Sequence, residues 1–273
     1  MKSLTDNRIR RVFQERTHPL FIPYVTAGDP SPEVTVDLLT TLEEAGADII
    51  ELGVPYSDPL ADGPVIQNAS ERALQNGVTL NTVLDMASQA RRKSVSVPLV
   101  LFSYINPILR MGIRKLCERA ATAGFDGLIV PDLPLEESRE LKDIAGKHNL
   151  ALIPLVAPTS EERIRRIVSD AQGFVYCVSS LGTTGTRDEF AAEVLSFLDR
   201  VRSLSSIPTA VGFGISKREH VVKFAPHADA VIVGSALVRE IQNASEHFLH
   251  PDPERQRAGH DHVREFVRSL KNE

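Results

Sequence analysis

Residues 45–50 of the chain read AGADII, residues 123–129 read AGFDGLI, and residues 228–233 read ADAVIV. Each segment has the pattern of a helix end, a short turn and a buried strand that is entered through an aspartate. Three copies of one helix-to-strand connection, spread over the chain, indicate a repeated β/α unit. Such a repeat favours an α/β fold with parallel strands, because a helix then links each strand to the next.

Eight short runs rich in β-branched and apolar residues alternate with longer segments of helical spacing. Their nearly continuous hydrophobicity is typical of parallel strands that are covered on both faces. Residues 80–90 carry apolar side chains at helical spacing, and residues 164–171 do the same behind residues 159–162, which have the pattern of an N-cap followed by first-turn acids. The predicted strands are Leu20–Ala27, Ala47–Val54, Pro98–Ile105, Phe125–Val130, Leu150–Val156, Phe174–Ser179, Pro208–Phe213 and Asp229–Val233.

Eight β/α units without a Gly/Ser-rich linker predict one (β/α)8 (TIM) barrel, with residues 1–273 as a single domain. The alternative is an open, doubly wound sheet of the Rossmann type, which uses the same alternation of strands and helices. Residues 247–262 are rich in His, Pro, Arg and Asp. We interpret them as a loop before a last helix over Val263–Leu270. A metal site is not expected there, because the segment follows the last strand and lies outside the barrel.

The composition argues against several classes of protein. A formal net charge of −5 disfavours a nucleic-acid binder. Two cysteines, Cys117 and Cys177, give no disulfide or metal-binding pattern and suit a reducing cytosol. The charged N-terminus lacks a secretory signal, and no apolar run approaches the roughly 20 residues that span a bilayer. We therefore expect a cytoplasmic protein that binds neither nucleic acid nor a membrane.

The active site of such a barrel forms at the carboxyl ends of its strands, and this rule singles out Glu51. Alternation in the predicted second strand puts Glu51 on the opposite face from Ile50 and Leu52. If the aliphatic pair faces the helices, Glu51 points into the barrel near its mouth. Burial there would raise the pKa of its carboxyl group towards a useful acid–base range. The alternative is a structural glutamate paired with a buried arginine, but no strand supplies an obvious one.

Asp58 and Asp62 lie in the Pro- and Gly-containing loop that follows Glu51. Loop aspartates often form turns, so the sequence alone leaves open which of the two takes part in chemistry. A second carboxylate in the same pocket could divide acid and base work with Glu51. Tyr176, a polar aromatic residue in the predicted sixth strand, is a third candidate for proton-transfer chemistry.

Glycines after the last three strands predict a phosphate site. Loops after strands 7 and 8 commonly bind phosphate in these barrels, because backbone N–H groups and a helix dipole attract the anion. The segments are Gly182–Thr186, Gly212–Gly214 and Gly234–Ser235. No lysine or histidine ends a predicted strand, which disfavours a Schiff-base aldolase, a zinc-dependent aldolase and a His-assisted isomerase.

Two runs of sequence closely resemble the tryptophan synthase alpha subunit family. They are residues 21–30, FIPYVTAGDP, and residues 51–67, ELGVPYSDPLADGPVIQ, the second of which is the family's long and highly specific signature. The resemblance continues through Tyr104–Pro107, Asp132–Pro134, Gly212–Ile215 and Gly234–Ala236, and it therefore covers nearly the whole chain.

This resemblance implies a lyase of tryptophan biosynthesis that cleaves indole-3-glycerol phosphate to indole and glyceraldehyde 3-phosphate by retro-aldol chemistry. Glu51 would protonate indole C3 and take the proton from the glycerol 3′-hydroxyl, while Asp62 would accept the indole N–H bond. The indole ring would be walled by Phe21, Phe102, Ile129, Tyr176, Thr184 and Phe213. The phosphate would be held by Gly185, Gly214, Gly234 and Ser235, and Gly212 is a further expected substrate-binding residue.

The resemblance also implies a partner. Family members work with a pyridoxal-phosphate beta subunit that receives the indole, in an alpha2beta2 heterotetramer. Residues 58–64 and Pro131–Pro134 match the partner-facing and switching regions, and no cofactor is expected in this chain itself. Two alternatives remain: a stand-alone lyase that releases free indole, and a catalytically silent scaffold subunit. The presence of both Glu51 and Asp62 argues against the silent scaffold.

Overall fold

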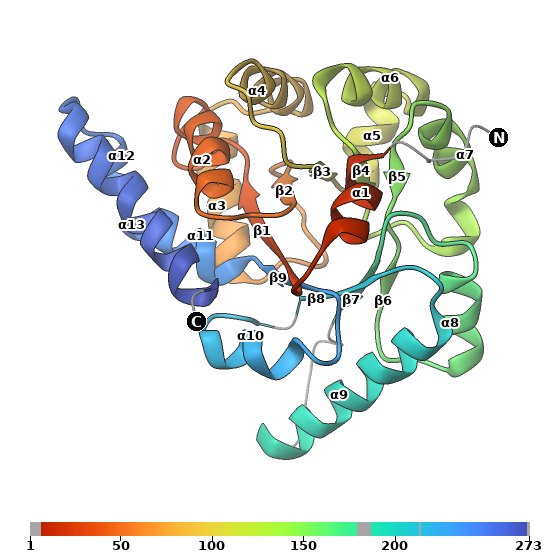
Figure 1. Cartoon of the computed structure of the whole chain (residues 1–273). Helices are drawn as coiled ribbons and strands as arrows, with labels where there is room; N and C mark the ends of the chain where they lie inside the picture. Colours follow the sequence, from red (N-terminus) through yellow and green to blue (C-terminus); the bar gives the residue numbers. More distant parts are fainter. Residues whose placement is uncertain (1–6, 179–186, 213, 272–273) are drawn as a thin grey trace.

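The computed structural model of the chain describes residues 7–178, 187–212 and 214–271. In this part of the chain parallel strands form a ring with helices around it (Figure 1). Their order around the sheet is β5-β4-β3-β2-β1-β9-β8-β7-β6. The strands are β1 (Leu20–Thr26), β2 (Ile50–Gly53), β3 (Leu99–Phe102), β4 (Gly127–Ile129), β5 (Ala151–Leu152), β6 (Leu155–Val156), β7 (Val175–Val178), β8 (Thr209–Gly212) and β9 (Ala230–Val233).

The ring closes through β5 and β6, the two edges of the sheet, which are halves of the single predicted strand Leu150–Val156. The Ile153 N–H donates to the Leu128 carbonyl at 2.9 Å, whereas the Pro154 carbonyl accepts from the Tyr176 N–H at 3.0 Å. Proline has no N–H, so the strand changes its pairing partner at this residue. The two pieces occupy one position in the ring. The (β/α)8 barrel is thereby confirmed, and the open Rossmann-type sheet is excluded.

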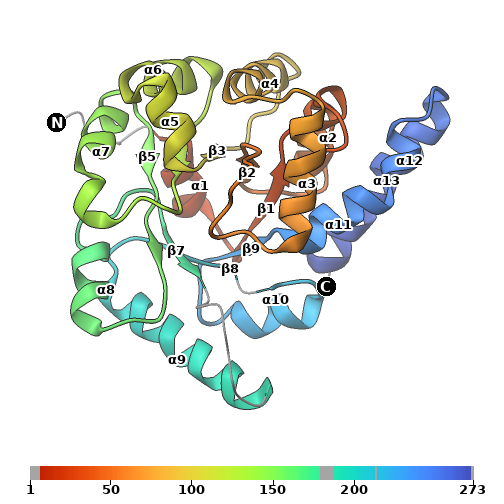
Figure 2. The ribbon, with the colours of Figure 1, turned by 180° about the vertical axis from the view of Figure 1, so that it is seen from behind.

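Helices fill the connections between the strands (Figures 1 and 2). Several begin where a hydroxyl side chain caps the first turn. Ser160, for example, accepts from the Arg163 N–H at 3.3 Å, at the start predicted from sequence.

No helix within the described ranges is both long and apolar enough to cross a membrane. The helices are α1 (Arg8–Glu15), α2 (Pro32–Glu44), α3 (Pro64–Gln75), α4 (Leu80–Arg92), α5 (Ile105–Met111), α6 (Ile113–Ala123), the 3-10 helix η1 (Leu135–Glu137), α7 (Arg139–Lys147), α8 (Glu161–Val168), α9 (Arg187–Leu204), α10 (Arg218–Phe224), α11 (Ser235–Asn243), α12 (Ser245–Phe248) and α13 (Pro253–Lys271).

The last helix starts ten residues earlier than the sequence predicts. The sequence favours a loop over residues 247–262, but α12 reaches Phe248 and α13 begins at Pro253. The Asp252 side chain accepts from the Glu254 N–H at 2.9 Å, and proline is well suited to a first helical position. The loop-forming residues Asp252 and Pro253 thus start a helix. Figures 1 and 2 show α12 and α13 extending away from the ring.

The core has two layers. The outer layer lies between strands and helices and includes Ile50 and Leu52 of β2. The inner layer fills the barrel and includes Ile49 and the N-terminal helix residue Phe13. Phe13 packs against Phe174 with ring centroids 5.6 Å apart. Helix α1 therefore closes one end of the barrel (Figure 1) and leaves the other end, where the strands terminate, for the site.

Candidate active site

Glu51 lies on β2 and points into the barrel. Its neighbours Ile50 and Leu52 belong to the outer layer, as strand alternation predicts. The Glu51 side chain is fully buried, at 0% exposure, and within the described residues neither carboxyl oxygen has a hydrogen-bonding partner. Burial raises the pKa of Glu51 to about 8. The carboxyl group is therefore mostly protonated at neutral pH and can act as an acid.

Asp62 lies in the loop between β2 and α3 and is held by Tyr104. The Tyr104 hydroxyl donates to Asp62 Oδ2 at 3.1 Å and accepts from the Ala61 N–H at 3.0 Å. Burial raises the pKa of Asp62, and the bond from Tyr104 opposes that rise. Asp58, in contrast, is exposed and accepts a bond from the Ser57 hydroxyl at 2.6 Å. The structure thus separates two aspartates that the sequence could not distinguish.

Two tyrosines share the barrel interior with these carboxyl groups. Tyr176 comes from β7, and Tyr24 comes from β1, where it is the register partner of Glu51. Burial is the main cause that raises the pKa of each phenol well above its ordinary value. The negative charges of Glu51 and Asp62 raise both further, so both hydroxyl groups lie within electrostatic reach of the carboxyl pair.

Two glycines make room for these tyrosines. A Cβ added at Gly53 would lie 2.2 Å from the Tyr24 hydroxyl oxygen, and one added at Gly212 would lie 2.7 Å from that of Tyr176. Either contact is far inside van der Waals distance, so each phenol occupies the space that another residue's side chain would fill. Gly212, predicted as a phosphate-binding residue, therefore has a packing role beside Tyr176.

Aromatic and aliphatic side chains line the inner layer around Glu51. Phe102 and Ile129 lie there, at the ends of β3 and β4, where the sequence predicts an indole wall. The Phe102 ring packs edge-on against Tyr24, with centroids 5.5 Å apart. The Phe102 ring also meets Tyr104 edge-on at 6.4 Å. Sequence reasoning did not assign a role to Tyr24 or Tyr104, although alternation along β1 places Tyr24 on the inward face.

Phe21 does not reach this pocket. It belongs to the outer layer, and the Lys271 ammonium group lies 5.9 Å from its ring centroid. Successive residues of a strand point to opposite faces, so Ile22 and Tyr24 face inward while Phe21 faces the helices. The resemblance implies that Phe21 is part of the indole wall, whereas β1 directs Phe21 towards the helices and Tyr24 into the barrel.

The predicted phosphate residues lie at the carboxyl ends of β8 and β9. Gly234 precedes α11, and Ser235 is its first residue; the Gly234 carbonyl accepts the Val238 N–H at 3.0 Å. The first N–H groups of α11 have no partner within the helix, as at any helix start. Gly214 has a φ of 56°, and a Cβ added there would meet nothing within 4 Å. Three other predicted residues, Thr184, Gly185 and Phe213, lie outside the described residues.

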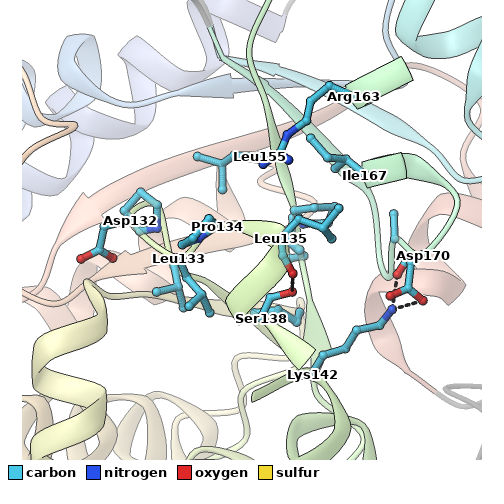
Figure 3. Close-up of a pocket in the computed structure, with 16 residues that line it drawn as sticks. Asp132, Leu133, Pro134, Leu135, Ser138, Lys142, Leu155, Arg163, Ile167 and Asp170 are labelled. Atoms are coloured by element: carbon cyan, nitrogen blue, oxygen red, sulfur yellow. Dashed lines mark hydrogen bonds and ion pairs between the residues drawn. The ribbon is translucent and has the colours of Figure 1, made fainter. Parts of the chain in front are cut away.

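A cavity of about 470 Å³ lies between the segment that follows β4 and helices α7 and α8 (Figure 3). Its lining includes Leu133, Leu155 and Ile167, and the Lys142 ammonium group on its rim pairs with Asp170. Neither Glu51 nor Asp62 lines it. Among the described residues no group of three or more His, Cys, Asp or Glu side chains could hold a metal ion.

Comparisons with known proteins agree with this geometry. A family model described as the tryptophan synthase alpha chain matches residues 11–272. The alpha chain of Halalkalibacterium halodurans is 51% identical over 92% of this chain and 94% of that protein. The crystal structure of the alpha subunit from Legionella pneumophila has a TM-score of 0.84 at 38% identity, covering 98% of this chain and 99% of the other. A chain from the tryptophan synthase α2β2 complex of Pyrococcus furiosus has a TM-score of 0.81 at 37% identity, over 94% and 99% of the two chains. The chain described here therefore belongs to the tryptophan synthase alpha chain family.

Proposed function

We propose that this chain is the alpha subunit of a tryptophan synthase and cleaves indole-3-glycerol phosphate to indole and glyceraldehyde 3-phosphate. The observation that carries the proposal is the buried, unpartnered carboxyl group of Glu51 in an aromatic pocket that also holds Asp62. Such a pair can divide acid and base work, because burial keeps Glu51 protonated while Tyr104 favours the ionised form of Asp62.

The first step is protonation of the substrate. Glu51 donates its proton to C3 of the indole ring, and the ring nitrogen gains positive charge. The Asp62 carboxylate accepts the ring N–H and stabilises that charge. The protonated indole is itself the electron sink, so the cleavage needs neither a lysine Schiff base nor a metal ion.

The second step breaks the carbon–carbon bond. The Glu51 carboxylate, now ionised, takes the proton of the glycerol 3′-hydroxyl. The electron pair of that O–H bond forms the aldehyde carbonyl, and the pair of the C3–C3′ bond returns to the indole ring. Glu51 ends protonated, as it began, so one group serves both proton transfers.

The substrate lies across the mouth of the barrel in this proposal. Phe102, Ile129 and Tyr176 contact the indole ring, and Tyr24 replaces Phe21 in that wall. The phosphate binds at Gly214, Gly234 and Ser235, where free backbone N–H groups and the dipole of α11 attract it. Gly212, Thr184, Gly185 and Phe213 remain predicted members of the same site.

The partner is a pyridoxal-phosphate beta subunit in an α2β2 heterotetramer, which takes up the indole; the cofactor belongs to that subunit. Exposed leucines support a docking face at this end of the barrel. Leu60, in the loop after β2, is 81% exposed, and Leu109 of α5 is 57% exposed. We further infer one domain over residues 1–273 and a cytoplasmic location. A stand-alone lyase would use the same carboxyl pair, and no observation favours it.

The test is release of indole from indole-3-glycerol phosphate by the purified chain, measured with and without a tryptophan synthase beta subunit. We expect cleavage in both cases and faster cleavage in the complex. Equal rates in the two assays would favour the stand-alone enzyme. No indole in either assay, from a folded chain with a beta subunit active in its own reaction, would overturn the proposal.

A further inference from the structure

The loop that carries Asp62 lies at the surface of the barrel mouth. Its members Asp58, Leu60 and Gly63 are exposed, and Asp62 itself is partly buried. A loop of this kind is fixed by its hydrogen bonds more than by packing. The direction of the Asp62 carboxylate depends on those bonds, because the backbone of a residue sets where its side chain can point.

Two hydrogen bonds hold the main chain, one before and one after the Asp62 side chain. Before it, the Ala61 N–H donates to the Tyr104 hydroxyl at 3.0 Å. After it, the Asp62 carbonyl accepts from Gln67 Nε2 at 2.7 Å. Tyr104 already has a place in the proposed reaction, since its hydroxyl also donates to the Asp62 carboxylate. Gln67 has none so far.

The bond from Gln67 does not serve the helix to which Gln67 belongs. Helix α3 starts after Gly63, which makes no side-chain cap bond. The groups that a helix start leaves free are N–H donors, and another donor cannot satisfy them. The Gln67 amide instead reaches back past Gly63 to the carbonyl of Asp62, a residue outside the helix. Because Gln67 is exposed, water can replace this bond at little cost to folding.

We infer that Gln67 is a positioning residue, whose bond to the Asp62 carbonyl keeps the Asp62 carboxylate aimed at the N–H of the indole ring. The inference rests on the proposed function, in which Asp62 accepts that N–H. Gln67 acts through Asp62 and takes no part in proton transfer. Without its bond, the peptide unit between Asp62 and Gly63 can rotate, and the carboxylate leaves its best position. A misplaced carboxylate stabilises the charge on the ring nitrogen less well.

The first test compares Gln67→Met with the unchanged chain, both as folded proteins with matching circular dichroism. Methionine is close to glutamine in length and in helix propensity, but it has no N–H donor. We expect kcat/KM for indole release to fall about 10-fold, because a small misplacement of a catalytic group is costly. Gln75→Met is the matched control: it makes the same change at an exposed position at the other end of α3, and kcat/KM should stay within about 2-fold.

A second measurement isolates the bond to the ring N–H. Indole-3-propanol phosphate and its 1-benzothiophene counterpart lack the glycerol hydroxyls and differ in the ring, where sulfur replaces N–H. The unchanged chain should bind the indole analogue at least about 10-fold more tightly, because its N–H alone can bond to the Asp62 carboxylate. Gln67→Met should lose most of this preference and bind the benzothiophene analogue normally, whereas Gln75→Met should keep the preference. A merely structural role would weaken both analogues alike.

The inference is overturned if Gln67→Met keeps kcat/KM within about 2-fold of the unchanged chain, or if it keeps the preference for the indole analogue. Failure of the proposed function would look different. The unchanged chain would then release no indole and would bind the two analogues equally.

Discussion

A buried carboxyl group without a hydrogen-bonding partner is more stable in its neutral form than in its ionised form. Glu51 is in this situation among the described residues, so burial favours its protonated state. Asp62 has the opposite balance, because a tyrosine hydroxyl donates to its carboxylate. In the proposed reaction, the roles of acid and base are thus set by what surrounds two chemically similar side chains. The assignment gives the reaction a pH dependence with a definite direction.

The activity should depend on the protonated form of Glu51. Its pKa is raised to about 8, so kcat/KM should fall as the pH rises through about 8, and the decline of kcat/KM on the acidic side should follow protonation of Asp62. Glu51→Gln should lose about 10²–10⁴-fold in kcat at neutral pH, because an amide transfers no proton. Initial rates of indole release across pH measure both effects. A variant that keeps a tenth of kcat would remove Glu51 from the mechanism.

Tyr104→Phe should act on Asp62 and leave Glu51 alone. The substitution removes the hydroxyl that donates to Asp62 and accepts from the Ala61 N–H. The bond lowers the pKa of Asp62, so its loss should raise that pKa. The acidic limb of the kcat/KM profile would then move to higher pH, while the limb near pH 8 stays in place. An unshifted acidic limb would mean that Tyr104 does not set the ionisation of Asp62.

The strands are the elements that the sequence predicts best. Each predicted run contains an observed strand, because a strand buried on both faces must be apolar along its length. Alternation also orients Glu51 correctly, and in β1 the same rule directs Tyr24 inward and Phe21 outward, against the indole wall expected from the family resemblance. The choice between Asp58 and Asp62 depends on Tyr104, 42 residues from Asp62, a contact that no local pattern encodes.

Helix starts are harder to predict, because aspartate and proline are common both in loops and at the first positions of helices. Asp252 and Pro253 have the composition of a loop, yet they cap a helix of 19 residues. The helix forms because Val263, Val267 and Leu270, further along it, are buried, and that packing makes a long helix favourable.

The start of α11 gives a test at this scale. A Cβ added at Gly234 would meet its nearest neighbours at 3.8 Å, so the protein itself has room for a side chain there. Gly234→Val should nevertheless raise KM sharply, because the valine methyl groups would cover the N–H groups proposed to bind phosphate. At saturating substrate kcat should fall much less than kcat/KM. An unchanged KM would place the phosphate elsewhere, for instance near Arg110 or Arg114.

Across the whole molecule, stability and chemistry lie at opposite ends of the barrel. Helix α1 closes the end at which the strands begin, through Ile9 and Phe13 in the inner layer. The Asn7 side chain ties this helix to the ring through bonds of 2.8 Å to the Asp126 and Asn149 carbonyls. The carboxyl pair and the glycine segments lie where the strands end. Substitutions at the closed end should therefore change stability without changing the reaction.

Phe13→Ala tests this separation. Truncating a buried phenylalanine typically lowers the free energy of unfolding by about 3–5 kcal/mol, and Phe13 loses its ring contact with Phe174. Urea denaturation should show that loss, while kcat and KM at low temperature stay within about 2-fold. Phe102→Ala, the same change at the open end, should impair both. A large fall in kcat for folded Phe13→Ala would show that the two ends are coupled.

Because strand pairing is interrupted at Ile153–Pro154, we expect that the chain can be split there into two fragments that reassemble. Strands β5 and β6 pair with β4 and β7 and are joined to each other through the chain alone, so a nick between Ile153 and Pro154 would break no strand pairing in the sheet. The fragment ending at Ile153 would carry Glu51 and Asp62, and the fragment beginning at Pro154 would carry Tyr176 and Gly234. Neither fragment alone has a complete site, so indole release by a mixture of the two would report their reassembly along the β1–β9 pairing.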